Sequence, residues 1–169
     1  MTSPAAKPAP SAPRILRPTI PIDEARAAEL RAANINPRTG LATDYLNHFN
    51  EAVMLLEMVP DMPECSEDFL AWSPLSYAEH FIASNFRARD LAIEAYESAD
   101  PLTRAEFDHM TETMTNILTA VSDAMRDAPD ATRAKLAVQA LSWLKELVQA
   151  TGGIINAGTE GNVDYIMTH

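Results

Sequence analysis

The residues best suited to chemistry in this sequence are its histidines and the acids near them. His48 stands three residues before Glu51, the reverse of the Glu-x-x-His spacing that di-metal helical bundles use. Both orders set the two side chains one helical turn apart, so His48 and Glu51 are candidate metal ligands. A metal needs ligands that converge in a shielded pocket, whereas Glu51 falls opposite the apolar face of its expected helix. The pattern therefore predicts no metal centre, and this pair is kept only as an alternative.

His80 carries a second candidate chemistry, phosphoryl transfer. Helical spacing places it on the polar arc of the second long helix, with Ser84 and Arg87. An exposed mid-helix histidine near a cation is what a histidine-phosphotransfer bundle needs. Such bundles also carry a lysine three residues after the histidine and then a glycine, where this chain has Ala83 and Ser84. A solvated surface histidine is the favoured interpretation, and phosphotransfer through His80 remains an alternative.

An interior polar pair is the most informative anomaly. Asn85 and Arg89 are four residues apart and fall inside the apolar arc of the second long helix. Buried Asn and Arg side chains must be paired or they destabilise the fold. The sequence therefore predicts a buried polar network that fixes helix register, with Glu57 of a neighbouring helix as the partner acid. Two other interpretations stay open: a pocket between helices for an anionic or amide ligand, and a subunit interface at Arg89.

Patterns for cofactors and nucleophiles are missing from the sequence. Cys65 is the only cysteine, which excludes an internal disulfide and a Cys-rich zinc site. The glycines near the C-terminal end lack the Lys-Ser/Thr of a phosphate-binding loop. The methionines are more typical of adaptable core packing than of haem ligation. We therefore expect no cofactor and favour a non-enzymatic protein.

The charge distribution bears on partners and location. The net charge is −11, yet residues 1–40 carry +3, so the remaining, acidic body carries −14. Such a body repels phosphate backbones and anionic lipid, and no apolar run approaches 18 residues. Neither nucleic acid nor a membrane is expected as a partner. A single cysteine and the lack of an apolar signal sequence predict a cytoplasmic location, and the preference for Arg and Ala over Lys is typical of bacterial proteins.

Composition divides the chain into four parts. Residues 1–22 hold six prolines and no acid, which predicts a flexible or extended, basic, Pro-rich arm. Residues 23–40 are expected to form a short helix, capped by Asp23, and a linker. Residues 41–152 carry four amphipathic patterns with helical spacing. Residues 153–169 form a C-terminal tail that could add a short helix.

Capping signals mark the expected starts of the long helices. Thr43 is the predicted N-cap of the first, which should end before Pro60. Ser76-Tyr-Ala-Glu79 and Thr103-Arg-Ala-Glu106 both fit the capping box, in which serine or threonine and glutamate satisfy each other's free amides. These two boxes predict the starts of the second and third helices.

The fourth helix completes the predicted fold. It should run from about Asp130 to Thr151, with Trp143 facing inward and Gly152-Gly153 as its stop. Four amphipathic helices joined mostly by short turns predict an all-α protein, an antiparallel four-helix bundle with a short extra N-terminal helix.

The favoured function is a non-enzymatic helical module that acts through protein contacts, as a regulatory or interaction protein and as a homodimer. Its basis is the bundle pattern, the basic arm beside an acidic body, and the apolar residues of the tail. Two alternatives remain: a histidine-phosphotransfer protein that uses His80, and a helical bundle that binds a ligand or metal between helices.

Overall fold

The computed structural model describes residues 23–157, and helices account for most of this part of the chain. The all-α prediction is therefore confirmed. The predicted arm, residues 1–22, and all but the first residues of the predicted tail lie outside the described range. Two short 3-10 turns, Thr43–Tyr45 and Pro63–Cys65, precede α2 and α3. The α-helices within residues 23–157 are α1 (Glu24–Ala32), α2 (Leu46–Met58), α3 (Ser66–Ala71), α4 (Tyr77–Ala83), α5 (Arg89–Glu97), α6 (Pro101–Met125) and α7 (Asp130–Ile155).

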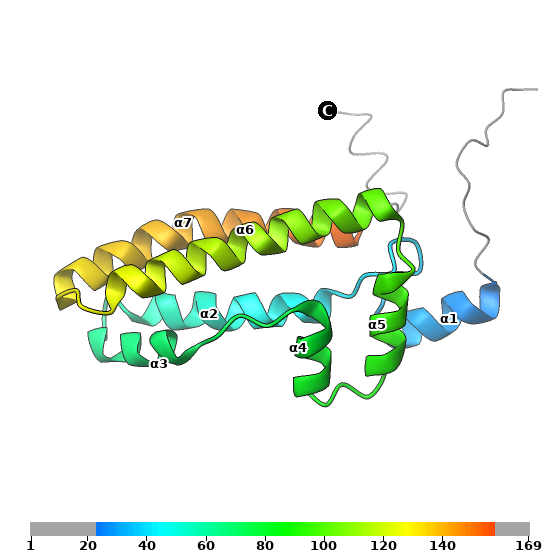
Figure 1. Cartoon of the computed structure of the whole chain (residues 1–169), viewed down its shortest axis with the longest axis horizontal. Helices are drawn as coiled ribbons and strands as arrows, with labels where there is room; N and C mark the ends of the chain where they lie inside the picture. The colour runs from blue at the N-terminus through cyan, green and yellow to red at the C-terminus, as the bar shows by residue number, and fades with distance from the viewer. Residues whose placement is uncertain (1–22, 158–169) are drawn as a thin grey trace, which may run out of the picture.

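The helices form two layers (Figure 1). Helices α6 and α7 lie side by side in one layer, and α2 and α3 lie beneath them. Helix α2 packs on α7, and α3 packs on α6. The short helices α4 and α5 pair with each other across the end of the second layer where α2 begins. Fully buried side chains between the layers form the core, among them Phe49, Leu56, Met114, Leu118 and Leu144.

Of the four predicted caps, those at Asp23 and Ser76 agree with the structure and those at Thr43 and Thr103 do not. Ser76 Oγ accepts from the Glu79 amide at 3.1 Å and Glu79 Oε1 accepts from the Ser76 amide at 2.7 Å, so this capping box is confirmed. Asp23 caps α1 as predicted. The box at Thr103 is wrong, because Asp100 caps α6 by accepting from the Thr103 amide at 3.0 Å. Pro101 favours this earlier start, since its fixed φ suits the first helical position.

The predicted second long helix is wrong as a single element. It is divided into α4 and α5, and Asn85 between them has a φ of 57°, in the left-handed region that a right-handed helix excludes. The turn brings the Phe86 ring to 5.0 Å from the Phe81 ring, centroid to centroid, so aromatic packing favours the break. Apolar spacing that continued across the break concealed it in the sequence. A four-helix bundle is therefore not confirmed: the long helices of residues 23–157 are α2, α6 and α7.

The predicted limits of the first and fourth helices need smaller corrections. Thr43 begins a 3-10 turn and makes no side-chain cap. Gly152 and Gly153 lie inside α7 and do not stop it, because Ile155 is buried and its carbonyl accepts from Thr39 Oγ at 2.7 Å. Trp143 is 47% exposed instead of facing inward, since Ala140 and Leu144 fill the core side of α7.

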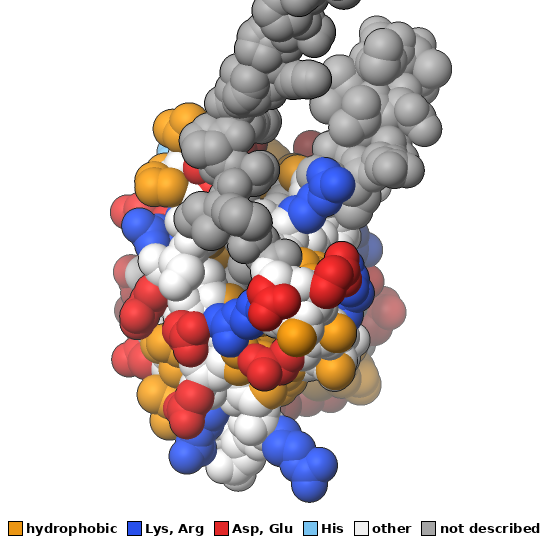
Figure 2. All heavy atoms as spheres, turned by 90° about the vertical axis from the view of Figure 1, so that its right-hand side faces the viewer, with side chains coloured by type: hydrophobic (Ala, Val, Ile, Leu, Met, Phe, Trp, Pro, Cys, Tyr) orange, Lys and Arg blue, Asp and Glu red, His pale blue; other side chains and the backbone are white. Residues whose placement is uncertain are grey.

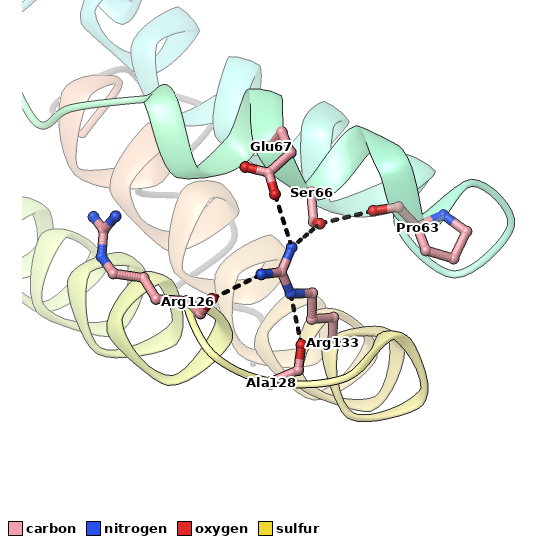
Figure 3. Close-up of polar contacts among 6 residues, drawn as sticks. All are labelled: Pro63, Ser66, Glu67, Arg126, Ala128 and Arg133. Carbon is pink, nitrogen blue, oxygen red and sulfur yellow. Dashed lines mark hydrogen bonds and ion pairs between the residues drawn. The ribbon is translucent and has the colours of Figure 1, made fainter.

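The turn between α6 and α7 is tied to α3 by one arginine (Figure 3). Arg133 Nε donates to the Ala128 carbonyl at 3.1 Å, and its Nη2 donates to the Arg126 carbonyl at 2.9 Å. Its Nη1 donates to Ser66 Oγ at 2.6 Å and lies 3.4 Å from a Glu67 carboxylate oxygen. The guanidinium thus satisfies carbonyls at the end of α6, where helical partners are lacking, and joins that end to α3.

A glycine brings the linker after α1 against α5. Gly40 has a φ of +73°, and a Cβ at this position would lie 2.7 Å from the Ala95 carbonyl oxygen. Only glycine adopts this backbone without strain while approaching another backbone so closely. The same loop is held by an isolated antiparallel bridge between Ile35 and Ala42. The linker is therefore a packed part of the fold.

Within residues 23–157, none of the helices combines the length and apolar character needed to cross a membrane. The longest, α7, carries charged side chains along its exposed face, including Lys135, Lys145 and Glu146.

Candidate functional site

The residues of the predicted buried polar network do not meet. Asn85 lies in the turn that separates α4 from α5, and Arg89 begins α5; both are exposed. Glu57 is also exposed and pairs with Lys145 of α7 at 3.1 Å. The prediction placed Asn85 and Arg89 on one face of a continuous helix, and the break at Asn85 removes that face.

His80 lies in a different environment from the one predicted. Its side chain is buried, and Nε2 lies 2.9 Å from a carboxylate oxygen of Asp44. Ser84 and Arg87 are exposed beyond the end of α4. The predicted solvated histidine with its neighbouring cation is therefore wrong, and the phosphotransfer alternative loses the accessible ring on which it rested. Asp44 was missed because it comes from a 3-10 turn far away in sequence.

His48 is likewise buried, whereas Glu51 is exposed. The His48 Nε2 accepts a hydrogen bond from the Leu75 amide at 3.0 Å, and the ring stacks on Trp72 at 4.6 Å between centroids. Burial, with a smaller contribution from His80, lowers the pKa of His48 to about 4. The described residues contain no group of three or more His, Cys, Asp or Glu side chains that could hold a metal ion, and the metal alternative at His48 and Glu51 stays a prediction.

Both histidines belong to a cluster of aromatic rings. Tyr45 lies at its centre, with ring centroids 5.2 Å from Tyr77 and 5.6 Å from His80. The His48 and His80 rings are 6.1 Å apart. The cluster draws on six segments, namely the 43–45 turn, α2, the end of α3, α4, α5 and α6, so tertiary contacts create it. Its members are Tyr45, His48, Phe49, Trp72, Tyr77, His80, Phe81, Tyr96 and Phe107.

A cavity of about 310 Å³ opens beside this cluster, between the 74–76 segment and α6. Hydrogen bonds hold the three tyrosines that line it. The Tyr45 hydroxyl donates to the Leu75 carbonyl at 2.6 Å, and the Tyr77 hydroxyl accepts from the Ala42 amide at 2.9 Å. The rings are therefore oriented in advance of any ligand. The lining consists of Tyr45, Pro74, Leu75, Ser76, Tyr77, Tyr96, Phe107, Asp108, Thr111, Glu112 and Thr115.

The charge of this lining is negative. Asp108 and Glu112 are four residues apart on α6 and so share one face, while none of the lining residues is basic. Asp108 accepts from the Tyr96 hydroxyl at 2.6 Å. Burial, followed by this hydrogen bond, raises the pKa of Tyr96 to about 12. The phenol is thus neutral near pH 7, and the carboxylates supply the charge of the cavity.

The aromatic rim already holds one cation of the chain. The guanidinium carbon of Arg104 lies 5.8 Å from the Tyr96 ring centroid, within the range of a cation–π contact. Arg104 also donates to the Glu97 carbonyl at 2.8 Å, so its position is fixed. It is not part of the cavity lining. Rings and carboxylates of this kind favour a positively charged ligand.

Reasoning from the sequence missed this cavity. Tyrosines within apolar stripes are normally core residues, and nothing in their spacing indicates a void beside them. The one available signal was the pair of acids Asp108 and Glu112, which are four residues apart and so share one flank of the third predicted helix.

No protein-family model matches this chain, and no match was found among curated proteins or among solved structures. Its function is therefore inferred from the residues and their geometry.

Proposed function

We propose that this protein is a non-enzymatic binding protein for a small organic cation, held in the cavity between α6 and the 74–76 segment. One observation carries the proposal: fixed aromatic rings and two carboxylates surround the same cavity of about 310 Å³. Ring faces attract cations, most strongly when water is excluded. A cavity with aromatic walls and a few polar groups is the usual form of a small-molecule site.

Size and charge narrow the ligand class. A volume of about 310 Å³ is at the lower limit for ligand sites, which favours a compact ammonium compound over a nucleotide or a peptide. The net charge of −11 adds a long-range field that draws cations toward the molecule. The lining holds no histidine or cysteine, and its tyrosines are neutral and hydrogen-bonded, so the residues around the cavity suit binding better than catalysis.

Choline is expected to bind at least tenfold more tightly than dimethylbutanol, its uncharged isostere, because only the cation gains from the rings and carboxylates. Asp108→Asn keeps an oxygen acceptor for Tyr96 but removes the charge, and should weaken choline binding by about tenfold. Isothermal titration calorimetry measures both effects. Glu106→Gln is the matched control, since Glu106 is an exposed carboxylate of α6 outside the lining. Equal affinity for the two compounds, or no binding of choline, would overturn the proposal.

We propose, as a second function, that the chain associates with itself through an apolar surface on α2 and α7. Met54 of α2 is 58% exposed and Val138 of α7 57% exposed, and these two helices pack on each other. The Glu57–Lys145 ion pair joins the same two helices. A face that carries both charge signs and apolar groups can be complementary to its own copy, as a two-fold interface requires.

Met54→Glu should convert a dimer into a monomer, because it places a charge within the surface on α2 and α7. Sedimentation equilibrium measures the mass. Leu102→Glu is the control, since Leu102 is also exposed but lies at the start of α6. A wild-type chain that stays monomeric at every accessible concentration contradicts the homodimer. A partner of another kind, and a cytoplasmic location, stay predictions.

We also propose that the helices form a bundle in which α3 takes the fourth position. Helix α3 contacts both α2 and α6, and α7 contacts the same two helices. This supports a closed arrangement of α2, α3, α6 and α7. The predicted second long helix, now α4 and α5, then lies outside the bundle and builds one wall of the aromatic cavity.

A further inference from the structure

A second, larger cleft lies at the end of the molecule where the linker after α1, the start of α2 and the end of α7 meet. Its volume is about 720 Å³, and it shares no lining residue with the aromatic cavity. Its lining combines a polar rim with four large aliphatic side chains. The residues are Arg31, Asn34, Ile35, Asn36, Pro37, Arg38, Leu41, Thr43, Asp44, Leu46, Asn47, Asn50, Ile155 and Asn156.

Two guanidinium groups at this rim have no side-chain partner among residues 23–157. Neither Arg31 nor Arg38 forms an ion pair, and neither guanidinium forms a hydrogen bond, with any residue of 23–157. In contrast, Arg26 and Arg133 are engaged by carboxylates or carbonyls. An arginine fork presents several donors in one plane and binds carboxylates in a bidentate manner.

The only acid in the lining is already occupied. Asp44 accepts from the Asn47 amide group at 3.2 Å through one oxygen and lies 2.9 Å from His80 Nε2 through the other. Asn36 Oδ1 accepts from the Arg38 amide at 2.8 Å, which fixes the Asn36 side chain and leaves its NH₂ group as a donor. The free groups at the rim are therefore mainly donors.

Charges of both signs are mixed at this end of the molecule. Figure 2 shows the face on which α1 and α5 lie, where basic side chains stand among acidic ones and not within a uniformly acidic field. The strong negative charge of the whole chain still disfavours a multiply charged anion. A ligand with a single carboxylate and an apolar body suits the cleft best, since apolar side chains, Pro37 and Leu46 among them, line it beside the polar ones.

We propose that this cleft binds a carboxylate attached to an apolar group, with Arg31 and Arg38 holding the carboxylate and the apolar lining residues holding the apolar part. Two sources offer this chemistry. One is a free carboxylic acid. The other is the chain's own continuation after Ala157, where Glu160 and Asp164 stand among Val163, Ile166 and other apolar residues. This continuation begins directly after the lining residues Ile155 and Asn156.

The site is tested by titrating hexanoate, or its neutral isostere hexanamide, into the full chain. Shifts of the backbone amide NMR signals measure the binding. Hexanoate is expected to bind at least tenfold more tightly than hexanamide, and Arg31→Gln with Arg38→Gln should remove that preference. Arg87→Gln with Arg89→Gln is the matched control, because both are exposed arginines outside the cleft and, like the first pair, form no ion pair with a described residue. Equal loss in both double variants, or no preference for hexanoate in any form of the full chain, overturns the proposal.

A second arm distinguishes the two sources. If Glu160 and Asp164 occupy the cleft, Glu160→Gln with Asp164→Asn in the full chain should tighten hexanoate binding about tenfold, by removing an internal competitor. If the ligand is a free acid, this variant and the wild type should bind hexanoate alike. Because the cleft and the aromatic cavity share no lining residue, failure of the hexanoate experiment leaves choline binding unaffected, and the reverse also holds.

Discussion

Arg133→Ala is expected to lower the free energy of unfolding by about 2–4 kcal/mol. The side chain is only 12% exposed and donates to two carbonyls and to Ser66 Oγ. Its removal leaves carbonyls at the end of α6 without partners in a partly buried place and opens a void beside α3. Urea denaturation followed by circular dichroism measures the change.

Arg126→Ala is the matched control for this experiment. Arg126 is in the same turn, yet its side chain is 57% exposed and lies 3.8 Å from Asp123, so its loss should cost less than about 0.5 kcal/mol. Arg133→Lys should recover only part of the stability. The lysine ammonium lacks the planar fork with which the guanidinium binds the two carbonyls and Ser66 at the same time. Equal effects of the two alanine variants would show that Arg133 does not hold the turn.

Acidification from pH 6.5 to pH 4 should destabilise the fold by on the order of 2–3 kcal/mol through His48 alone. Its pKa is about 4 in the folded chain against an ordinary value of 6.5. In this interval the unfolded chain binds the proton and the folded chain does not, so unfolding becomes more favourable as pH falls. Above pH 6.5 both states are neutral and the contribution vanishes. The hydrogen bond from the Leu75 amide to Nε2 also makes the folded state less stable as the pH falls, because a protonated ring cannot accept it.

His48→Gln tests this assignment, because glutamine keeps an acceptor near the position of Nε2 but does not titrate. The variant should be less stable than wild type at pH 7, owing to the lost stacking on Trp72. Its stability should nevertheless fall less steeply between pH 6.5 and pH 4. The comparison uses unfolding free energies at matched pH values, so acids that titrate in both proteins cancel. Parallel slopes would assign the pH dependence to other groups.

Local signals in the sequence predicted the helical class and several boundaries. Ser76 with Glu79, and Asp23, act within one turn of the chain, so their caps follow from residue type and spacing alone. The same reasoning chose the wrong cap for α6, since both Asp100 and Thr103 were suitable and the adjacent proline favoured the first. The neighbouring proline, itself a local signal, decides between these two caps.

The site depends on contacts that no local pattern contains. His80 has helical spacing typical of a solvated residue, but a turn more than thirty residues earlier brings Asp44 to it. The break at Asn85 follows from the burial of Phe86 against Phe81, which hydrophobic periodicity along one helix cannot show. The aromatic cavity is the space that remains when the 74–76 segment, α5 and α6 meet. Its existence depends on the packing of all three.

The two glycines within α7 have a consequence for motion. Each lowers the intrinsic stability of the last turn by about 1 kcal/mol relative to alanine, and that turn is held by burial of Ile155 and by the bond from Thr39. The last turn can therefore open together with the linker while the rest of α7 stays folded. The backbone amide hydrogens of this turn are then expected to exchange with solvent through this local opening, whereas those around Leu144 exchange only on global unfolding. We therefore expect the end of α7, whose residues Ile155 and Asn156 line the large cleft, to behave as a separate cooperative unit.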